Sequence, residues 1–180
     1  MASLPHLVFT NSYGTQLLYH HGFLEAEDLA AVINAMPSDV STLNRLDRIL
    51  QEDKDHFETL RDMGRALRAS GFFDSSNAYY SKALQQRQAK KDAAQREPIL
   101  YEMAMNSLEL KDGKSAAESL EKCLKDFPKS ARRPETLFSL GKAYALDEKK
   151  DKARKALSSV IAEFPQSPAA TQAQALLQSL

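Results

Sequence analysis

The stretch that decides the fold begins at Leu137 and ends at Pro165. It reads Leu137-x-x-Leu140-Gly141-x-x-Tyr144, then Ala153-x-x-x-Leu157-x-x-Val160, then Pro165. Its apolar residues recur every three or four positions, a spacing that predicts two amphipathic helices. The polar pair Asp147-Glu148 separates the two halves, so we expect a tight turn and a helical hairpin.

The same spacing occurs twice more upstream of this stretch. One unit reads Leu100-x-x-Met103-Ala104-x-x-Ser107, Ala116-x-x-x-Leu120-x-x-Cys123, Pro128, and the other reads Leu60-x-x-Met63-Gly64-x-x-Leu67, Ser76-x-x-x-Tyr80-x-x-Ala83. A small residue occupies one shared position in every unit: Gly64, Ala104 and Gly141. We expect these residues to lie where the two helices of a pair touch, because only a small side chain lets them approach closely.

Proline and glycine place the predicted boundaries between helices. Pro98 is expected to end a long second helix of the first unit, and the other prolines fall between pairs or in first turns. The predicted helices cover residues 54–69, 74–95, 98–110, 113–126, 134–146, 149–163 and 167–179.

Residues 54–180 resemble a tetratricopeptide-repeat protein in this pattern of spacing. The resemblance implies a mainly α fold: an α-α superhelix of about three repeats with a C-terminal capping helix. The motifs Asp126-Phe127-Pro128-Lys129-Ser130 and Glu163-Phe164-Pro165-Gln166-Ser167 look like bacterial repeats found in envelope-associated assembly proteins. This favours the bacterial envelope or periplasm over the cytoplasm and leaves the compartment open.

The N-terminal segment differs from the repeats. Residues 7–9 and 16–19 are β-rich runs around Gly14, which predicts a hairpin, and an amphipathic helix follows Gly22. Residues 3–36 resemble the C-terminal part of a thioredoxin-like domain. In that family a proline at the position of Pro5 is cis and faces a Cys-x-x-Cys motif, which this chain lacks.

These patterns divide the chain into three predicted parts. Residues 1–37 form the thioredoxin-like fragment, a hairpin plus a helix; residues 38–53 form a linking helix; residues 54–180 form the repeat domain. A two-stranded hairpin is marginally stable alone and exposes strand edges. We therefore expect it to pack on helices near residues 24–52, to pair with another chain, or to be poorly ordered. Pairing with another chain leaves homo-oligomerisation through the first strand open.

Composition and charge exclude several classes of function. The 24 basic and 24 acidic side chains cancel, so the strong basic signal of a nucleic-acid-binding protein is missing. The charge is uneven, because residues 1–52 carry two basic and six acidic groups. No apolar run approaches the roughly 20 residues that span a bilayer, so no integral membrane segment is predicted.

Catalytic and metal-binding patterns are also missing from the sequence. Cys123 is the single cysteine, so neither a disulfide within the chain nor a Cys-x-x-Cys pair can form, and we expect it to be buried and inert. His20 and His21 are neighbours on a predicted strand and point to opposite faces, which argues against a shared metal ion. The sequence predicts no enzyme, no metal site and no cofactor.

The family resemblance places binding on the first helix of each pair, which lines a concave groove. In the first unit the groove positions hold Glu58, Arg61, Arg65 and Arg68, and the three arginines form a basic ridge. The matching positions of the other two units hold mostly apolar and aromatic side chains and one lysine: Tyr101, Met105, Leu108, Phe138, Ala145 and Lys142. Such a surface suits an extended or helical peptide with acidic and apolar groups.

Two other interpretations of these residues stay open. The arginines also fit a solvated helix face, and Tyr101 and Phe138 also fit packing against the N-terminal helices. Chaperone-tail receptors of the family clamp a carboxylate with asparagines and lysines. The matching positions here hold Arg65, Met105 and Lys142, without an asparagine.

We therefore predict a non-catalytic scaffold that binds a peptide or partner protein in the groove. The alternative is the C-terminal part of a thioredoxin-like oxidoreductase or chaperone whose catalytic half lies outside this chain. A basic run from Lys149 to Lys155 is explained by solubility, with a phosphate or membrane contact as the alternative.

Overall fold

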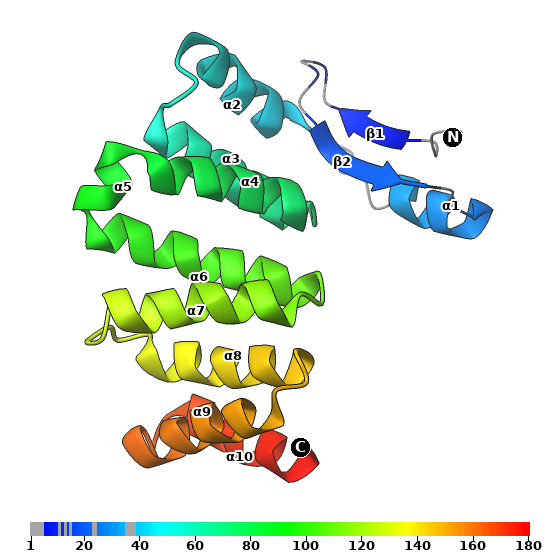
Figure 1. The fold of residues 1–180 in the computed structure, drawn as a ribbon. Coiled ribbons are helices and arrows are strands. Elements are labelled where there is room, and N and C mark those ends of the chain that lie inside the picture. Colours follow the sequence, from blue (N-terminus) through cyan, green and yellow to red (C-terminus); the bar gives the residue numbers. More distant parts are fainter. Residues whose placement is uncertain (1–5, 11, 13, 15, 23–24, 35–38) are drawn as a thin grey trace, which may run out of the picture. The chain divides into compact units, whose positions relative to one another are not determined.

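The computed structural model describes the chain except residues 1–5, 11, 13, 15, 23–24 and 35–38 (Figure 1). The described residues are mainly α-helical, with one short hairpin, as predicted. The chain divides into two compact units, Met1–Lys90 and Lys91–Leu180, which are called unit 1 and unit 2. The predicted boundaries after residues 37 and 53 stay predictions.

Unit 1 is built around one helix pair, α3 (Phe57–Ala69) and α4 (Phe73–Gln85). Helix α2 (Ser41–Glu52) packs on α3. Their core consists of apolar side chains from α2, α3 and the turn after α3: Leu43, Leu46, Met63, Leu67 and Phe72.

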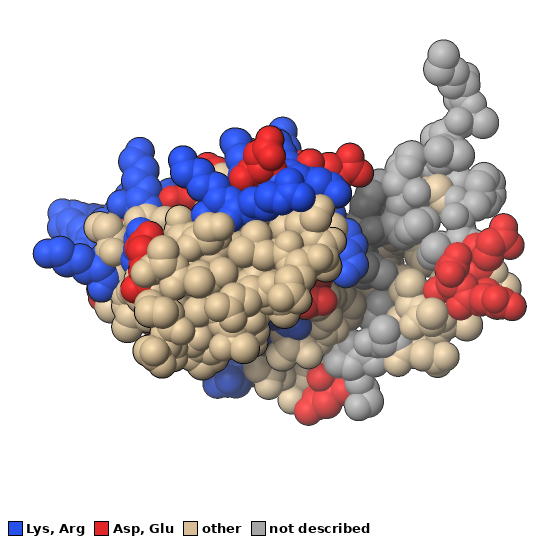
Figure 2. Space-filling view, turned by 90° about the horizontal axis from the view of Figure 1, so that it is seen from below, with Lys and Arg blue, Asp and Glu red and all other residues tan. Residues whose placement is uncertain are grey.

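Unit 2 contains two helix pairs and a final helix. The first pair is α6 (Ala93–Glu109) with α7 (Gly113–Asp126), and the second is α8 (Arg133–Leu146) with α9 (Lys150–Glu163). Helix α7 packs on α8, and α10 (Pro168–Ser179) packs on α9. Helix α10 contains no charged residue, and a broad uncharged surface faces the viewer in Figure 2, which looks at this end of unit 2.

The small residues lie where the helices of a pair touch, as predicted. A Cβ atom on Gly64 would lie 2.5 Å from the ring of Tyr80, and one on Gly141 would lie 2.5 Å from Cδ2 of Leu157. Ala104 is fully buried at the same position of the middle unit. The hydroxyl of Ser76 donates to the Gly64 carbonyl at 2.7 Å, a contact that needs the same close approach.

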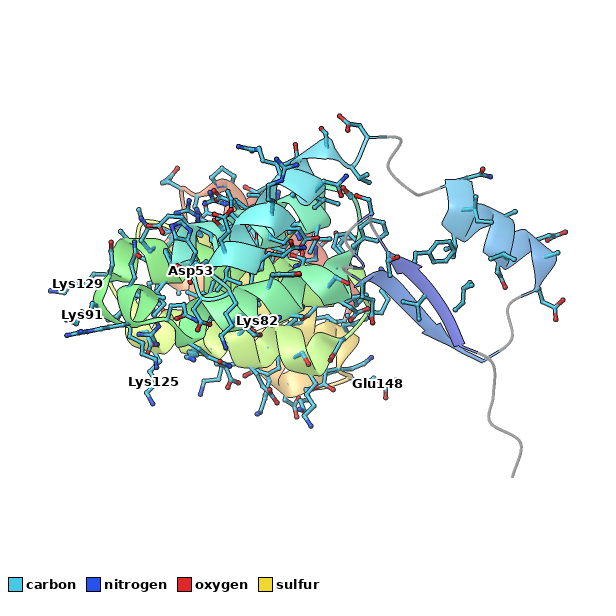
Figure 3. All side chains as sticks on the ribbon, turned by 90° about the horizontal axis from the view of Figure 1, so that it is seen from above. Asp53, Lys82, Lys91, Lys125, Lys129 and Glu148 are labelled. Carbon is cyan, nitrogen blue, oxygen red and sulfur yellow. The ribbon has the colours of Figure 1, made fainter. Side chains whose placement is uncertain are left out.

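The turns inside the three pairs share one conformation. Gly71, Lys111 and Glu148 all adopt positive φ angles, of 79°, 61° and 57°. After Gly71, the amide of Phe72 donates to the carbonyl of Leu67 at 2.9 Å, and the other two turns repeat this hydrogen bond. The pattern is a Schellman motif, which satisfies carbonyls at the end of a helix. Glu148 extends from the surface at its turn (Figure 3).

The predicted single helix over 74–95 is wrong. Helix α4 ends at Gln85, the short α5 (Arg87–Lys91) follows, and α6 begins at Ala93. The side chain of Asp92 accepts a hydrogen bond from the Ala94 amide at 2.9 Å, so it caps α6. Pro98 lies inside α6 instead of ending the preceding helix. Because proline has no amide hydrogen, only the backbone carbonyl of Ala94, an exposed residue, loses its helical donor.

The N-terminal hairpin and the helix after it occur where they were predicted. Strands β1 (His6–Thr10) and β2 (Gln16–His21) pair antiparallel, with an irregularity between Phe9 and Thr10, and α1 (Ala26–Asn34) follows. Strand β2 packs against α4, which was not among the predicted partners, and Gly14 of the hairpin lines a cavity together with Asp47, Leu50 and Gln51 of α2. The expected cis bond at Pro5 lies outside the described residues.

No helix in the described part of the chain is long and apolar enough to span a membrane.

Candidate functional site

The first helices of the pairs in unit 2 enclose a cavity of about 300 Å³. Helices α6, α8 and α10 each contribute at least one side chain near the C-terminal end of the helix. The lining residues are Leu108, Glu109, Lys111, Lys142, Ala145, Leu146 and Leu176. Leu108, Lys142 and Ala145 come from two repeats and were all predicted to share one surface.

The cavity combines an apolar lining with an excess of positive charge. Leu146 is 39% exposed, a high value for a leucine, so its side chain is available to a ligand. Lys142 is exposed, lies over the Phe138 ring with its ammonium 5.9 Å from the centroid, and forms no ion pair with a described residue. Lys111 adds a second cation, and Glu109 is the carboxylate among the lining residues.

The predicted aromatic residues of unit 2 are half-buried beside this cavity's helices. Tyr101 lies under the guanidinium of Arg132, which is 4.7 Å from the ring centroid. Tyr101 and Met105 pack on the core between the two pairs, and Phe138 packs on the core shared with α10. Both rings therefore pack within unit 2 and keep part of their surface accessible.

The predicted arginines of unit 1 are partly neutralised. The guanidinium of Arg61 lies 2.9 Å from the Asp62 carboxylate and 5.8 Å from the centroid of the Phe57 ring, and its side chain is only 16% exposed. Arg65 is more exposed and lies 3.5 Å from the same carboxylate. Arg68 is half-buried. The three arginines share one helix, but Asp62 lowers the positive charge that they present together.

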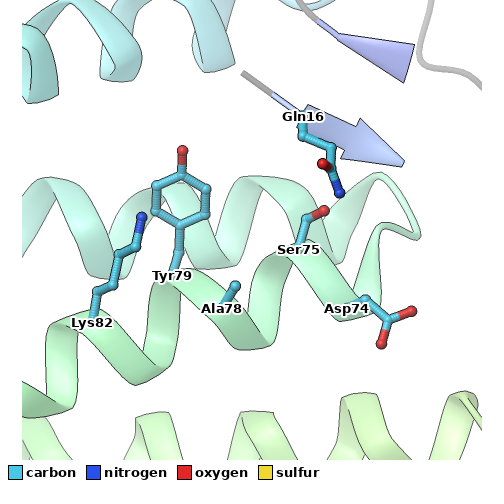
Figure 4. Close-up of a pocket in the computed structure, with 6 residues that line it drawn as sticks. All are labelled: Gln16, Asp74, Ser75, Ala78, Tyr79 and Lys82. Atoms are coloured by element: carbon cyan, nitrogen blue, oxygen red, sulfur yellow. The ribbon is translucent and has the colours of Figure 1, made fainter. Parts of the chain in front are cut away.

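Unit 1 contains a further hollow that the sequence did not predict. A cavity of about 360 Å³ lies between α4 and β2, lined by Gln16, Asp74, Ser75, Ala78, Tyr79 and Lys82 (Figure 4). The ammonium of Lys82 lies 5.0 Å from the centroid of the Tyr79 ring, and both residues also line a neighbouring cavity of about 300 Å³. Most of the lining comes from the second helix of the pair, whereas the prediction considered only first helices.

The described residues contain no group of three His, Cys, Asp or Glu side chains that could hold a metal ion. Cys123 is buried, as predicted, and burial raises the pKa of its thiol to about 12. Burial and a hydrogen bond to Glu121 raise the pKa of Tyr144 to about 12. Neither group is an ionised nucleophile near neutral pH.

Comparisons with known proteins agree with this architecture. The model of the tetratricopeptide repeat family matches residues 107–177. No curated protein matches the chain. A crystal structure of MamA is similar with a TM-score of 0.62 and 15% identity, covering 87% of this chain and 85% of that one.

Two further solved structures show the same fold. The Arabidopsis OM64 TPR domain is similar with a TM-score of 0.55 and 16% identity, covering 68% of this chain and 94% of that one. Another structure of the MamA protein is similar with a TM-score of 0.56 and 16% identity, covering 74% and 72% of the two chains. The comparisons give no support to the thioredoxin-like resemblance of residues 3–36, which stays a prediction. They show that the chain has the fold of tetratricopeptide-repeat proteins.

Proposed function

We propose that this chain is a non-catalytic scaffold that binds a peptide or partner protein at the cavity between α6, α8 and α10. One observation carries the proposal. Leu108, Lys142 and Ala145 lie on first helices of different repeats, and they line a single accessible cavity together with the exposed side chain of Leu146. Helix-pair repeats present such surfaces to their partners.

The ligand that fits this cavity has an apolar side chain next to a carboxylate. Burying one leucine-sized side chain contributes about 1.5–3 kcal/mol. A pairing with exposed Lys142 or Lys111 adds up to about 1 kcal/mol. Together these terms give weak binding, so the ligand must also contact neighbouring residues. Tyr101, Met105 and Phe138 offer such contacts in unit 2. Arg61, Arg65 and Arg68 of unit 1 are proposed as a partner-binding surface in their own right.

A panel of fluorescently labelled synthetic peptides tests the proposal. The panel contains short peptides that combine leucine with aspartate or glutamate, and matched peptides in which lysine replaces every acidic residue. Fluorescence anisotropy with the full chain should detect the acidic peptides and not the basic ones. If both sets bind equally, or neither binds, the proposed ligand chemistry is wrong.

Two charge-reversal variants locate the binding site. Lys142→Glu should weaken binding of an acidic peptide about tenfold, because it replaces an attraction with a repulsion. Lys125→Glu is the matched control, since Lys125 is also exposed but extends from α7, outside the cavity lining (Figure 3). Equal loss of affinity in both variants would indicate a nonspecific charge effect.

The oxidoreductase alternative makes a separate prediction. It requires a Cys-x-x-Cys motif encoded upstream of this chain, and reading that coding sequence tests it. Nothing in the described residues favours it over the scaffold.

A further inference from the structure

Helix α1 has an apolar stripe that the described part of the chain covers only in part. None of its residues is buried. Leu29, Val32 and Ile33 recur at the three- and four-residue spacing of one helix face, and Ile33 is 52% exposed. An amphipathic helix gains most of its stability from packing this face, so α1 needs a partner surface.

The same helix is strongly acidic. Glu27 and Asp28 lie in its first turn, and the Glu25 carbonyl accepts the Leu29 amide, so Glu25 belongs to the same turn. No lysine or arginine precedes Arg45 in the sequence. A partner for α1 therefore needs apolar contacts flanked by positive charge.

Unit 2 has a groove with this combination. A cavity of about 320 Å³ between α8 and α9 is lined by Leu137, Leu140, Tyr144, Lys152, Lys155, Ala156 and Ser159. Leu137, Leu140 and Tyr144 follow one face of α8, whereas the two lysines lie one turn apart on α9. The groove is distinct from the cavity of the proposed function, with which it shares no lining residue.

The charges around the groove leave these two lysines available. Lys149 pairs with Asp147, Lys150 donates to the Leu180 carbonyl, and Arg154 lies 4.0 Å from Asp151. Lys152 and Lys155 form no ion pair with a described residue, although the Lys152 ammonium lies 5.3 Å from the centroid of the Tyr144 ring.

Two carboxylates adjoin residues of the groove and compete only in part. Glu121 of α7 accepts the Tyr144 hydroxyl, and Asp151, which precedes Lys152, has Arg154 as its neighbour. Lysine and arginine side chains gather along one edge of the molecule in Figure 2. Five of the seven residues from Lys149 to Lys155 are basic, so this part of α9 stays positive.

We propose that α1 of one copy docks in the α8–α9 groove of a second copy. The nine residues of α1 form a helix about 13 Å long. Leu137 and Tyr144 are about 10 Å apart along α8, and the apolar stripe from Leu29 to Ile33 is about 6 Å long, so the stripe fits within the groove floor. Glu25 and Asp28 are three residues apart, as are Lys152 and Lys155, so two ion pairs can form along one flank.

The complementary charge identifies a second copy as the partner. The acidic helix belongs to unit 1 and the basic groove belongs to unit 2 of the same sequence, so each copy has one donor helix and one acceptor groove. Two copies that exchange their α1 helices make two equivalent contacts, which is the arrangement of a two-fold dimer.

Two full-length variants test this contact by complementation. The first, Leu29→Asp with Ile33→Asp, removes the apolar stripe and keeps the groove. The second, Lys152→Glu with Lys155→Glu, reverses the groove charge and keeps the helix. Sedimentation velocity over a wide range of concentration should show a dimer for the unaltered chain, and dimerisation at least about tenfold weaker for each variant alone. An equimolar mixture of the two should regain heterodimers, because each supplies the half that the other lacks.

A matched control separates this contact from other causes. Lys125→Glu with Lys129→Glu changes charge equally outside the groove and should dimerise normally. Circular dichroism should show equal helix content in all variants. The proposal is overturned if the unaltered chain stays monomeric, which is the result expected if α1 docks on its own chain. It is also overturned if either double variant dimerises normally, which is the result expected if dimers form through the β1 edge. Absence of a heterodimer in the mixture would overturn it as well.

Discussion

Replacing Gly64 by alanine should destabilise unit 1, although alanine is the better helix former. The added Cβ would lie 2.5 Å from two atoms of the Tyr80 ring, far inside van der Waals contact. Tyr80 is fully buried, so its ring has no free space to move into. Overpacking of this kind costs about 1–3 kcal/mol. An approach of 2.5 Å to two ring atoms belongs to the upper part of that range, about 2–3 kcal/mol, and alanine regains about 1 kcal/mol of helix propensity. We therefore expect a net loss of about 1–2 kcal/mol.

Urea denaturation followed by circular dichroism measures this loss, and hydrogen exchange of the α3 and α4 amides assigns it to unit 1. Gly141→Ala is the matched comparison, because its Cβ would meet Leu157, a branched side chain that can change rotamer more readily than a ring. We expect Gly141→Ala to cost less than Gly64→Ala. The double variant Gly64→Ala with Tyr80→Leu should lose less stability than the sum of the losses of the two single variants, because the clash needs the Tyr80 ring. A Gly64→Ala chain as stable as the unaltered one would refute the close-contact explanation.

Three further predictions follow from the turns and the titrating groups. Gly71→Ala should cost about 1 kcal/mol because an L side chain disfavours positive φ, whereas Lys111→Gly should leave stability equal or raise it in the same urea titration. Stability should fall as pH rises from the ordinary Cys123 pKa of 9.0 towards about 12, since the unfolded thiol ionises first, and Cys123→Ala should flatten this fall. Asp112→Ala should cost about 1 kcal/mol of stability, because it removes the side chain that caps α7 at the Ser115 amide. The hydrogen bonds from Ser115 lower the pKa of Asp112. The stability that they contribute should therefore be lost as the pH falls below the ordinary value of 3.8.

The helix pairs could be predicted because their packing depends on local sequence. The spacing around Leu60, Leu100 and Leu137 identifies the buried face of each first helix, and a small residue one turn later identifies the contact with the second helix. Both signals lie within a single repeat. No information from distant parts of the chain was needed to place them.

The connection between the first two pairs shows the opposite case. Pro98 is a strong local signal for a helix end, but the Asp92 side chain caps α6 and starts it earlier. An aspartate cap and a proline compete here, and the sequence alone does not say that Ala94 is exposed and can spare its backbone partner. The break at Gln86, where the backbone is extended, has no comparable proline or glycine signal.

The candidate cavity was predicted in part because only some of its residues belong to the repeat pattern. Leu108, Lys142 and Ala145 follow from the register of the first helices. Leu176 was missed because α10 has no second helix after it in this sequence, so the repeat alignment does not reach it. Leu146 was missed because it is the last residue of α8, where the repeat pattern does not indicate which face of the helix a side chain is on.

Ion pairs with neighbouring carboxylates decide which of the predicted cations can attract an acidic ligand. The helical spacing of the cations alone does not reveal these ion pairs. Arg61 and Arg65 have the predicted spacing, but Asp62 lies next to one and three residues from the other, so one carboxylate contacts both guanidinium groups. Lys142 has no carboxylate at such a position, since its nearest acidic neighbours in sequence are Glu135 and Asp147. An acidic partner should therefore gain more from Lys142 than from either arginine, because binding at Lys142 breaks no existing ion pair.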